Sequence, residues 1–208
     1  MHNQKFSRDD LEIVSTRTLY HGFFTLAEYS FKHKLFAGGW SDVVTREVFE
    51  RGHAVVVLPY DPVRDEVVLI EQVRFPAFAT SKSPWLLELV AGMIATDEQP
   101  QDVAHRELLE ETGLTALQLH AVNSYLASPG GTSERFYFYW AQVDASNAKG
   151  LHGLPEEHED IRIQVMSRDE AYNLVVTGEI DNASTVIGLQ WLQLNHQQIQ
   201  QQTKQNAD

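Results

Sequence analysis

The sequence predicts a mixed β-sheet accompanied by helices, in the α+β or α/β class, with an N-terminal β extension. Short apolar or alternating runs of strand length recur along the chain. A few segments instead carry the start and stop residues of helices. Gly- and Pro-containing turns separate these runs, and no internal repeat is present. This order indicates one main body with strands and helices intermixed.

The N-terminal extension is the first element to justify. Residues 1–15 are polar, and we expect them to be loosely held. Residues 25–33 alternate between apolar and polar side chains, which is the pattern of a half-buried strand. Residues 43–49 follow a Gly38-Gly39 turn and form a second extended segment. The two segments predict a small antiparallel sheet.

The main body begins with an apolar run at 52–58, which predicts a central buried strand. Turn residues at 59–62 separate it from a partner strand at 66–70. Further strands are predicted at 85–90, 119–126, 136–143 and 161–166. Two later helices are predicted, from the capping box at Ser167 through Val176 and over 183–199, with a fraying Gln-rich end.

The composition of the chain excludes several kinds of site and disfavours several kinds of partner. The chain has 208 residues, a net charge of −13 and no cysteine. The missing thiols exclude disulfides, zinc–thiolate sites and cysteine nucleophiles. The negative charge disfavours nucleic acid and anionic membranes as partners. No apolar run is long enough to span a bilayer, and the N-terminus lacks the apolar core of a secretory signal, so we expect a cytoplasmic protein.

The best-marked helix begins at Pro100 and ends before Gly113. Glu107, Glu110 and Glu111 share one face of it, because residues three and four apart lie on the same side. Carboxylates crowded near a helix C-terminus repel each other and oppose the helix dipole. We therefore expect a hard divalent cation, above all Mg²⁺, to compensate them; the alternative is a solvent-exposed acidic face.

Residues 92–114 read GMIATDEQPQDVAHRELLEETGL. They match the signature of the Nudix superfamily, G-x5-E-x7-R-E-U-x-E-E-x-G-U, at every position. The segments 85–88, 128–134 and 156–160 resemble the bacterial ADP-ribose pyrophosphatase branch of that superfamily, and the likeness covers nearly the whole chain. The resemblance implies an α/β/α sandwich of the α+β class. It also implies an N-terminal β subdomain at 1–50 and a hydrolase domain at 51–208.

The resemblance implies an enzyme that hydrolyses ADP-ribose to AMP and ribose 5-phosphate by attack of water on the pyrophosphate. Two or three Mg²⁺ ions would assist, with Mn²⁺ as a possible substitute. The implied metal ligands are the Ala91 carbonyl, Glu107, Glu110, Glu111 and Glu159. Of these, Glu107 and Glu111 are also implied to be catalytic. The implied structural residues of the motif are Gly92, Glu98, Arg106 and Gly113.

The general base is expected outside the signature, in the acidic loop 156–160. We assign it to Glu157, with His158 as a weaker candidate. The alternative is an ordinary solvated loop, and the choice among neighbouring acids depends on the resemblance alone.

Substrate contacts are also implied by resemblance. Arg74 is expected to bind phosphate. Phe23 is expected to stack on the adenine, with Arg46 of a partner subunit on its other side. Met93, Ser128 and Glu134 match positions at the terminal ribose. The alternative for each is a surface or core residue without a ligand.

Two alternatives to ADP-ribose hydrolysis stay open. The substrate could be another nucleoside diphosphate sugar, such as GDP-mannose or ADP-glucose, because the signature carries the shared chemistry and not the sugar pocket. The chain could also be a non-catalytic nucleotide sensor, which the intact carboxylates disfavour. The N-terminal strands cannot bury both faces alone, so we expect a homodimer that exchanges them.

Overall fold

The structure is a computed structural model that describes residues 5–207, without the side chains of Glu157, Asn206 and Ala207. The chain divides into two compact units. The N-terminal unit comprises residues up to Gly52 together with the segment 126–135. The main unit comprises residues 53–125 and the described chain from Phe136 onward.

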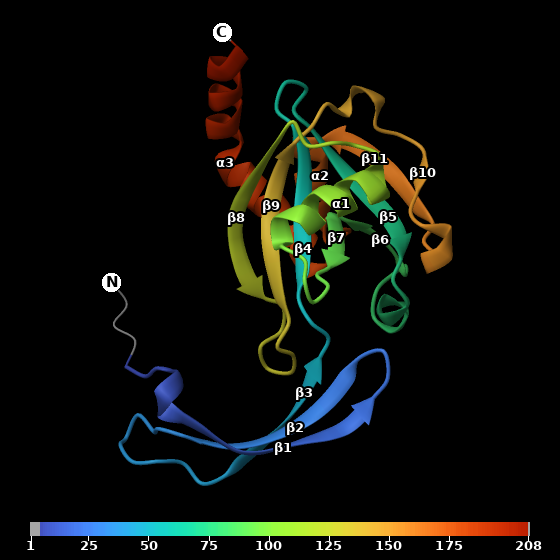
Figure 1. The fold of residues 1–208 in the computed structure, drawn as a ribbon. Helices are drawn as coiled ribbons and strands as arrows, with labels where there is room; N and C mark the ends of the chain where they lie inside the picture. Colours follow the sequence, from blue (N-terminus) through green and yellow to red (C-terminus); the bar gives the residue numbers. More distant parts are fainter. Residues whose placement is uncertain (1–4, 208) are drawn as a thin grey trace. The chain divides into compact units, whose positions relative to one another are not determined.

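The N-terminal unit contains a three-stranded antiparallel sheet in the order β1-β2-β3, seen in blue in Figure 1. Its strands are β1 (Leu11–His21), β2 (Thr25–His33) and β3 (Val44–Glu50). The prediction of a loose segment at 1–15 was wrong for its described part. Ser7 caps a short 3-10 helix, η1 (Arg8–Asp10), and β1 begins at Leu11. All residues of β1 are exposed, so its sequence carries no buried face that could have revealed it.

The segment 126–135 is fastened to β3 within the same unit. The Phe49 N–H donates to the Gly131 carbonyl at 2.8 Å. The Thr132 hydroxyl donates to the Phe49 carbonyl, also at 2.8 Å. The Ser128 carbonyl accepts from the N–H groups of Gly131 and Thr132, which forms the tight turn. Hydrogen bonds from the backbone and from the Thr132 hydroxyl therefore hold the turn against β3.

The main unit is built on a mixed sheet in the order β10-β11-β5-β4-β9-β8, in which β4 and β9 are parallel. The long strands are β4 (Ala54–Asp61), β5 (Glu66–Val73), β8 (Gln118–Leu126), β9 (Arg135–Gln142) and β11 (Ile161–Ser167). The short strands are β6 (Trp85–Glu88), β7 (Val90–Met93) and β10 (Leu151–His152). The helices are α1 (Pro100–Thr112), α2 (Arg168–Thr177), α3 (Ala183–Ala207) and the 3-10 turns η2 (Phe75–Ala79), η3 (Ala145–Asn147) and η4 (Pro155–Glu157).

Helices cover both faces of this sheet, with α1 on one side and α2 and α3 on the other (Figure 1). Strand β4 shows how the sequence divides between the two cores. Val56 and Leu58 pack with α2 and α3, whereas Val57 packs with Ala104 and Leu108 of α1. Alternate residues of a strand point to opposite faces, so a fully apolar strand fills both layers. The predicted α/β/α sandwich is thereby confirmed.

Strands β4 and β5 form a fork. They pair directly near their turn, at Tyr60–Val67 and Asp61–Glu66, so Pro59, Tyr60 and Asp61, predicted as turn residues, belong to the strand. Farther along, β7 pairs with β4, and β6 pairs with β5. The single strand predicted at 85–90 was wrong for this reason. The chain changes partner at Leu89, whose N–H donates to the Thr185 hydroxyl at 3.0 Å.

The boundaries of α1 and α2 follow their local sequence signals closely. Helix α1 has Pro100 in its first turn and Gly113 as a left-handed C-cap at φ 69°. Ser167 and Glu170 form the capping box of α2. Helix α3 continues through the Gln-rich segment to Ala207, beyond the predicted end at 199. No helix in the described part of the chain is both long and apolar enough to cross a bilayer.

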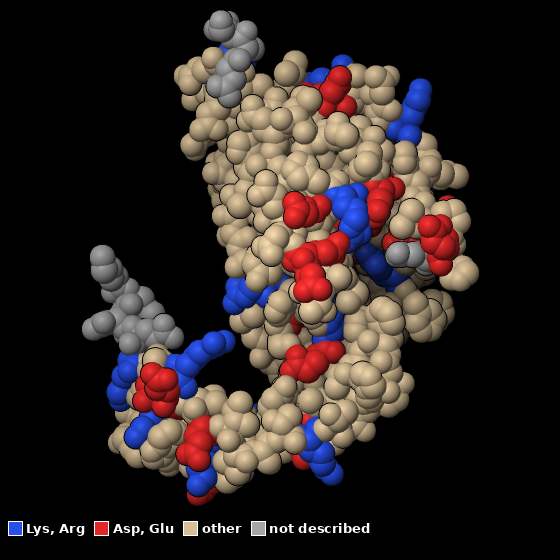
Figure 2. Space-filling view, viewed as in Figure 1, with Lys and Arg blue, Asp and Glu red and all other residues tan. Residues whose placement is uncertain are grey.

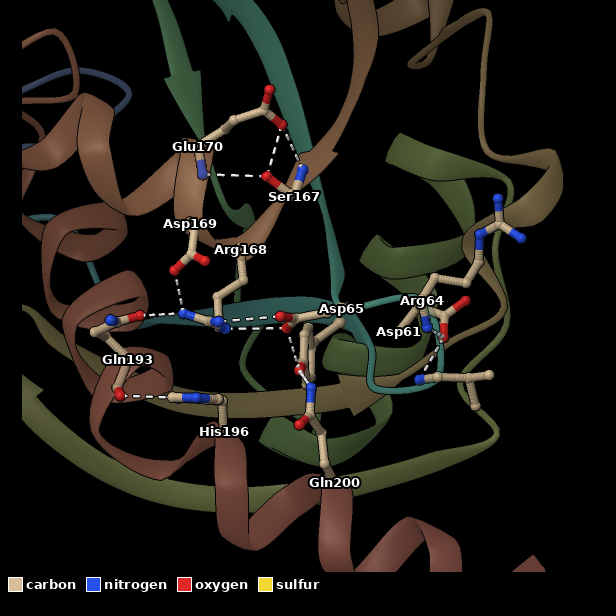
Figure 3. A network of polar contacts seen from close by, with 12 residues as sticks. Asp61, Arg64, Asp65, Ser167, Arg168, Asp169, Glu170, Gln193, His196 and Gln200 are labelled. Atoms are coloured by element: carbon tan, nitrogen blue, oxygen red, sulfur yellow. Dashed lines mark hydrogen bonds and ion pairs between the residues drawn. The ribbon is translucent and has the colours of Figure 1, made fainter.

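A polar network joins the β4–β5 turn to α2 and α3 (Figure 3). The buried Arg168 guanidinium donates two hydrogen bonds to Asp65, each 3.0 Å long. The Tyr60 hydroxyl donates to Asp65 at 2.7 Å and accepts from Gln200 at 3.1 Å. Burial, and then the bond to Asp65, raise the pKa of Tyr60, so it stays a neutral donor. The network fixes the end of the sheet at the β4–β5 turn, which is opposite the end where β4 and β5 separate.

Candidate active site

Helix α1 directs carboxylates toward the sheet because its apolar face continues into its acidic one. Ala104 and Leu108 are fully buried in the core beneath the helix. Glu111 lies one turn beyond Leu108 on the same side and is only 2% exposed. Glu107 and Glu110 flank it, with 13% and 28% of their side chains exposed. The carboxylate face of α1 therefore points toward the core, and the alternative of a solvent-exposed acidic face is wrong.

Glu111 is held against the first residues of the signature. Its Oε2 accepts the Ala91 N–H at 3.1 Å. Burial raises the pKa of Glu111 well above its ordinary value, and the bond from Ala91 opposes this only in part. The charges of Glu107 and Glu159 raise it further. Such a carboxylate needs a neighbouring positive charge to be ionised at neutral pH.

Glu107 has a related environment. Burial is the main cause that raises its pKa to about 7, and the charges of Glu110 and Glu159 add to it, while Arg106 acts in the opposite direction. The carboxylate lies directly against the backbone of Gly92, where a Cβ would overlap it. This contact explains why the first position of the signature is glycine here: any side chain would displace a carboxylate of the cluster.

Arg106 gathers the acidic residues of the signature. It forms ion pairs with Glu98 at 3.3 Å, Glu107 at 2.8 Å and Glu110 at 3.1 Å. Glu98 also accepts the Ala95 N–H at 2.9 Å, and this bond is the main cause that lowers its pKa. Figure 2 shows red and blue atoms gathered over the region where α1 lies in Figure 1. Arg106 and Glu98 thus connect the loop to the helix.

The residues present suit a divalent cation by donor type and charge. The cluster offers only hard oxygen donors, and two of its carboxylates have raised pKa values. Among the described residues no three acidic or histidine side chains form a ready-made ligand set. Arg106 engages two of the carboxylates instead. A bound cation would supply the positive charge that the buried Glu111 requires.

The acidic loop lies beside this cluster. Its backbone forms η4 and then a left-handed residue, His158, at φ 57°. Glu159 is partly buried, and its charge acts on both Glu107 and Glu111. The side chain of Glu157, the predicted base, lies outside the described residues. Its assignment stays a prediction.

Two predicted substrate residues belong to the main unit. Arg74 follows β5, is 43% exposed and pairs with Glu88 at 2.8 Å. Its charge counts among the influences that lower the pKa of Glu111, which places it near the cluster. Met93 ends β7 and is 40% exposed. Sequence reasoning assigned no role to Glu88, although a glutamate on a strand among leucines was a usable signal.

The other predicted substrate residues belong to the N-terminal unit. Phe23 is 88% exposed and contacts Phe24 edge-on at 4.7 Å between ring centroids. Arg46 and Ser128 are exposed, and Arg46 donates to the Thr45 carbonyl at 2.8 Å.

Glu134 is 5% exposed and forms an ion pair with Arg51 at 3.2 Å. Sequence reasoning missed Arg51, which also lies over the Phe24 ring at 5.0 Å. Its role could not be predicted from the local sequence, because its partners Glu134 and Phe24 are both far from Arg51 along the chain.

Comparison with known proteins decides the family. The NUDIX domain family matches residues 50–186, which include the carboxylate cluster and the acidic loop. The chain belongs to the Nudix family. Hydrolases of this family generally use divalent metal ions, in agreement with the donor set described above.

Among curated Nudix relatives, the ADP-ribose pyrophosphatase of Escherichia coli K12 is 58% identical over 93% of both chains. The ADP-ribose pyrophosphatase of Haemophilus influenzae is 52% identical over 98% of this chain and 95% of its own length. The GDP-mannose pyrophosphatase of Shigella flexneri serotype 5b is 33% identical over 73% of this chain and 78% of its own. A crystal structure of an ADP compounds hydrolase shares the fold, with a TM-score of 0.66 at 22% identity over 91% and 97% of the two chains.

Proposed function

We propose that this Nudix protein is an ADP-ribose diphosphatase that hydrolyses ADP-ribose to AMP and ribose 5-phosphate with the help of Mg²⁺. The observation that carries the proposal is the cluster of core-facing carboxylates, Glu107 and Glu111, beside Ala91. It occurs in a chain that belongs to the Nudix family. The relatives named ADP-ribose pyrophosphatase are similar over nearly their whole length. The relative named GDP-mannose pyrophosphatase is more distant and covers less of the chain.

In this reaction a water oxygen bonds to one phosphorus of the pyrophosphate, and the bond from that phosphorus to the bridging oxygen breaks. When bound, Mg²⁺ supplies charge neutralisation and a water of lowered pKa, with two or three ions in the site and Mn²⁺ as a substitute. The groups that would hold it are the Ala91 carbonyl, Glu107, Glu110, Glu111 and Glu159. Glu157 would accept the proton of the attacking water at its carboxylate.

The substrate-binding residues extend this proposal. Arg74 would bind a phosphate oxygen. Its side chain is 43% exposed, so the phosphate could reach it and replace Glu88 as its partner. Phe23 presents an exposed ring for stacking on adenine, with Arg46 of a second copy on the other side. Met93, Ser128 and Glu134 would line the terminal ribose.

A homodimer is the corresponding assembly, with residues 1–50 as the dimerisation subdomain. The three-stranded sheet exposes apolar side chains from its first strand, a pattern that favours burial against another chain. These residues are Leu11, Ile13, Val14, Leu19 and Tyr20, and they are 37–66% exposed. Exchange of these strands between two subunits would cover them. Light scattering at low micromolar concentration tests this, and a folded, active monomer would refute it.

The decisive experiment compares ADP-ribose, GDP-mannose and ADP-glucose with and without Mg²⁺ and identifies the products. Mg²⁺-dependent release of AMP and ribose 5-phosphate from ADP-ribose in preference to the others is expected. Preference for another sugar nucleotide would keep the chemistry and reject the proposed substrate. Binding without turnover of any substrate would favour the nucleotide sensor.

Glu157→Gln tests the proposed base. Loss of a general base slows the chemical step by about 10²–10⁴-fold. Mg²⁺ affinity should change little, because the proposed ligands remain. Equal rates for this variant and the wild type would assign the base to another acid of 156–160. The cytoplasmic location is likewise proposed and can be tested by cell fractionation.

A further inference from the structure

The loop that carries Glu159 begins at β10, and this strand lies beside the C-terminal end of α1. The Gly153 N–H donates to the Glu110 carbonyl, with 3.4 Å between nitrogen and oxygen. On its other side β10 pairs with β11, with His152 opposite Ile161. The base of the loop is therefore tied both to the sheet and to the helix that carries the carboxylate cluster.

The His152 ring lies against the residue that ends α1. A Cβ at Gly113 would lie 2.7 Å from the ring Cε1 and 3.4 Å from Nδ1, so the ring covers the glycine backbone. The ring Nε2 lies 3.2 Å from the Lys149 carbonyl and donates to it as the Nε2–H tautomer. Gly113 needs its left-handed φ of 69° to end α1. The His152 ring is a second, independent reason for a residue without a side chain there.

The loop closes on itself directly after His152. Gly153 has φ 95°, and a Cβ there would lie 2.7 Å from the Glu159 Cβ and 3.1 Å from its carbonyl oxygen. The Glu159 N–H donates to the Leu154 carbonyl at 3.2 Å, and its Oε2 accepts the Leu154 N–H at 3.3 Å. The position of Glu159 therefore depends on how the start of the loop is anchored.

We propose that His152 is a positioning residue that locks the loop 153–160 onto the C-terminal end of α1. It acts through Gly113 and Lys149, and so fixes the position of Glu159 relative to Glu107 and Glu111. Its effect on turnover rests on the proposed function, whereas the anchoring itself does not. Small displacements of catalytic groups are costly, since about 1 Å can lower the rate about 100-fold.

Hydrogen exchange tests the anchoring without substrate. In metal-free protein, His152→Ala should raise the exchange rates of the Gly153 and Glu159 amides at least about tenfold, because their hydrogen bonds open more often. His152→Gln should keep most of the protection, since its amide can lie on Gly113 and donate to Lys149. Leu151→Ala is the matched control, because the neighbouring Leu151 side chain is 71% exposed. Unchanged exchange in His152→Ala would overturn the proposal.

Kinetics on the same proteins test the consequence. His152→Ala should lower kcat for ADP-ribose about 10- to 100-fold with KM within about twofold, and His152→Gln should recover most of the rate. Faster exchange with an unchanged kcat would overturn the positioning role. An equal loss in the Leu151→Ala control would do the same.

Absence of turnover in the wild type would instead reject the proposed function, and exchange would still decide the anchoring. If His152→Ala does not fold, His152→Val removes the ring with a residue suited to a strand, and the same outcomes apply.

Discussion

Glu107→Gln should stabilise the metal-free protein at neutral and alkaline pH although it removes a charged partner of Arg106. In the folded protein the pKa of Glu107 is raised from 4.5 to about 7, chiefly by burial. A raised pKa means that the folded state binds the proton more tightly than the unfolded state. The stability due to this proton is complete below pH 4.5 and is lost as the pH rises through about 7. Glutamine resembles the protonated carboxyl but does not titrate, so the variant does not lose this stability as the pH rises.

The size of the effect follows from the shift. One pKa unit corresponds to about 1.4 kcal/mol, so the full effect is about 3 kcal/mol. The advantage of Glu107→Gln in free energy of unfolding should be about 1 kcal/mol at pH 5.5 and about 3 kcal/mol at pH 8. The pKa of the neighbouring Glu111 is raised partly by the charge of Glu107. Removing that charge therefore acts in the same direction.

Urea unfolding with a chelator, at several pH values from 5.5 to 8, measures this difference. The exposed Asp97 offers a matched control, since Asp97→Asn removes a charge of the same loop–helix motif and should follow the wild type. Added Mg²⁺ should reduce or reverse the advantage, because the wild type gains more binding energy than the variant. Parallel curves for Glu107→Gln and the wild type over this pH range would refute the reasoning.

Three further predictions concern other parts of the molecule. Glu111→Gln should lower kcat about 1,000-fold, because a metal ligand is worth several kcal/mol in the transition state, while circular dichroism should show an intact fold; an active variant would exclude Glu111 as a ligand. Gly92→Ala should lower both activity and the unfolding midpoint, because the new methyl group overlaps the Glu107 carboxylate; wild-type activity would contradict the close contact. Asp65→Asn should cost about 2 kcal/mol at pH 7 in urea unfolding, since the buried Arg168 keeps only Asp169 as a charged partner. Burial opposes ionisation of Asp65, but the bonds from Arg168 and Tyr60 keep its pKa below 3.8, so this cost should persist at pH 5 and disappear only in stronger acid.

The parts of the fold that could be predicted are those specified by nearby residues. Helix α1 has both its proline start and its glycine end in the sequence, and its bounds agree with the structure. Strand β1 could not be found, because every one of its residues is exposed and no alternating pattern arises. The break at Leu89 was equally hidden, because the choice of pairing partner depends on strands far away in the sequence.

In the candidate site, too, the features that depend on nearby residues could be predicted, and those that depend on distant elements could not. The fixed spacing of the signature located Glu107, Glu110 and Glu111 and the Glu98–Arg106 pair, since these depend on one helix and the loop before it. The partners of Arg74 and Glu134 were not predictable, because Glu88 and Arg51 come from other elements. The base within 156–160 stays a prediction, since several acids occur in that loop and the sequence does not distinguish their side chains.

The fork of β4 and β5 has a consequence for how this sequence can vary. Strand β7 enters the fork with Ala91 opposite Val56 and Gly92 opposite Val55. Loss or gain of one residue between Leu89 and Gly92 would turn each side chain of β7 to the other face of the sheet. A side chain would then replace Gly92 beneath Glu107, and the Ala91 amide would leave Glu111. A substitution at one position of β7 changes one contact, whereas a single-codon deletion or insertion there changes them all and should inactivate the protein outright.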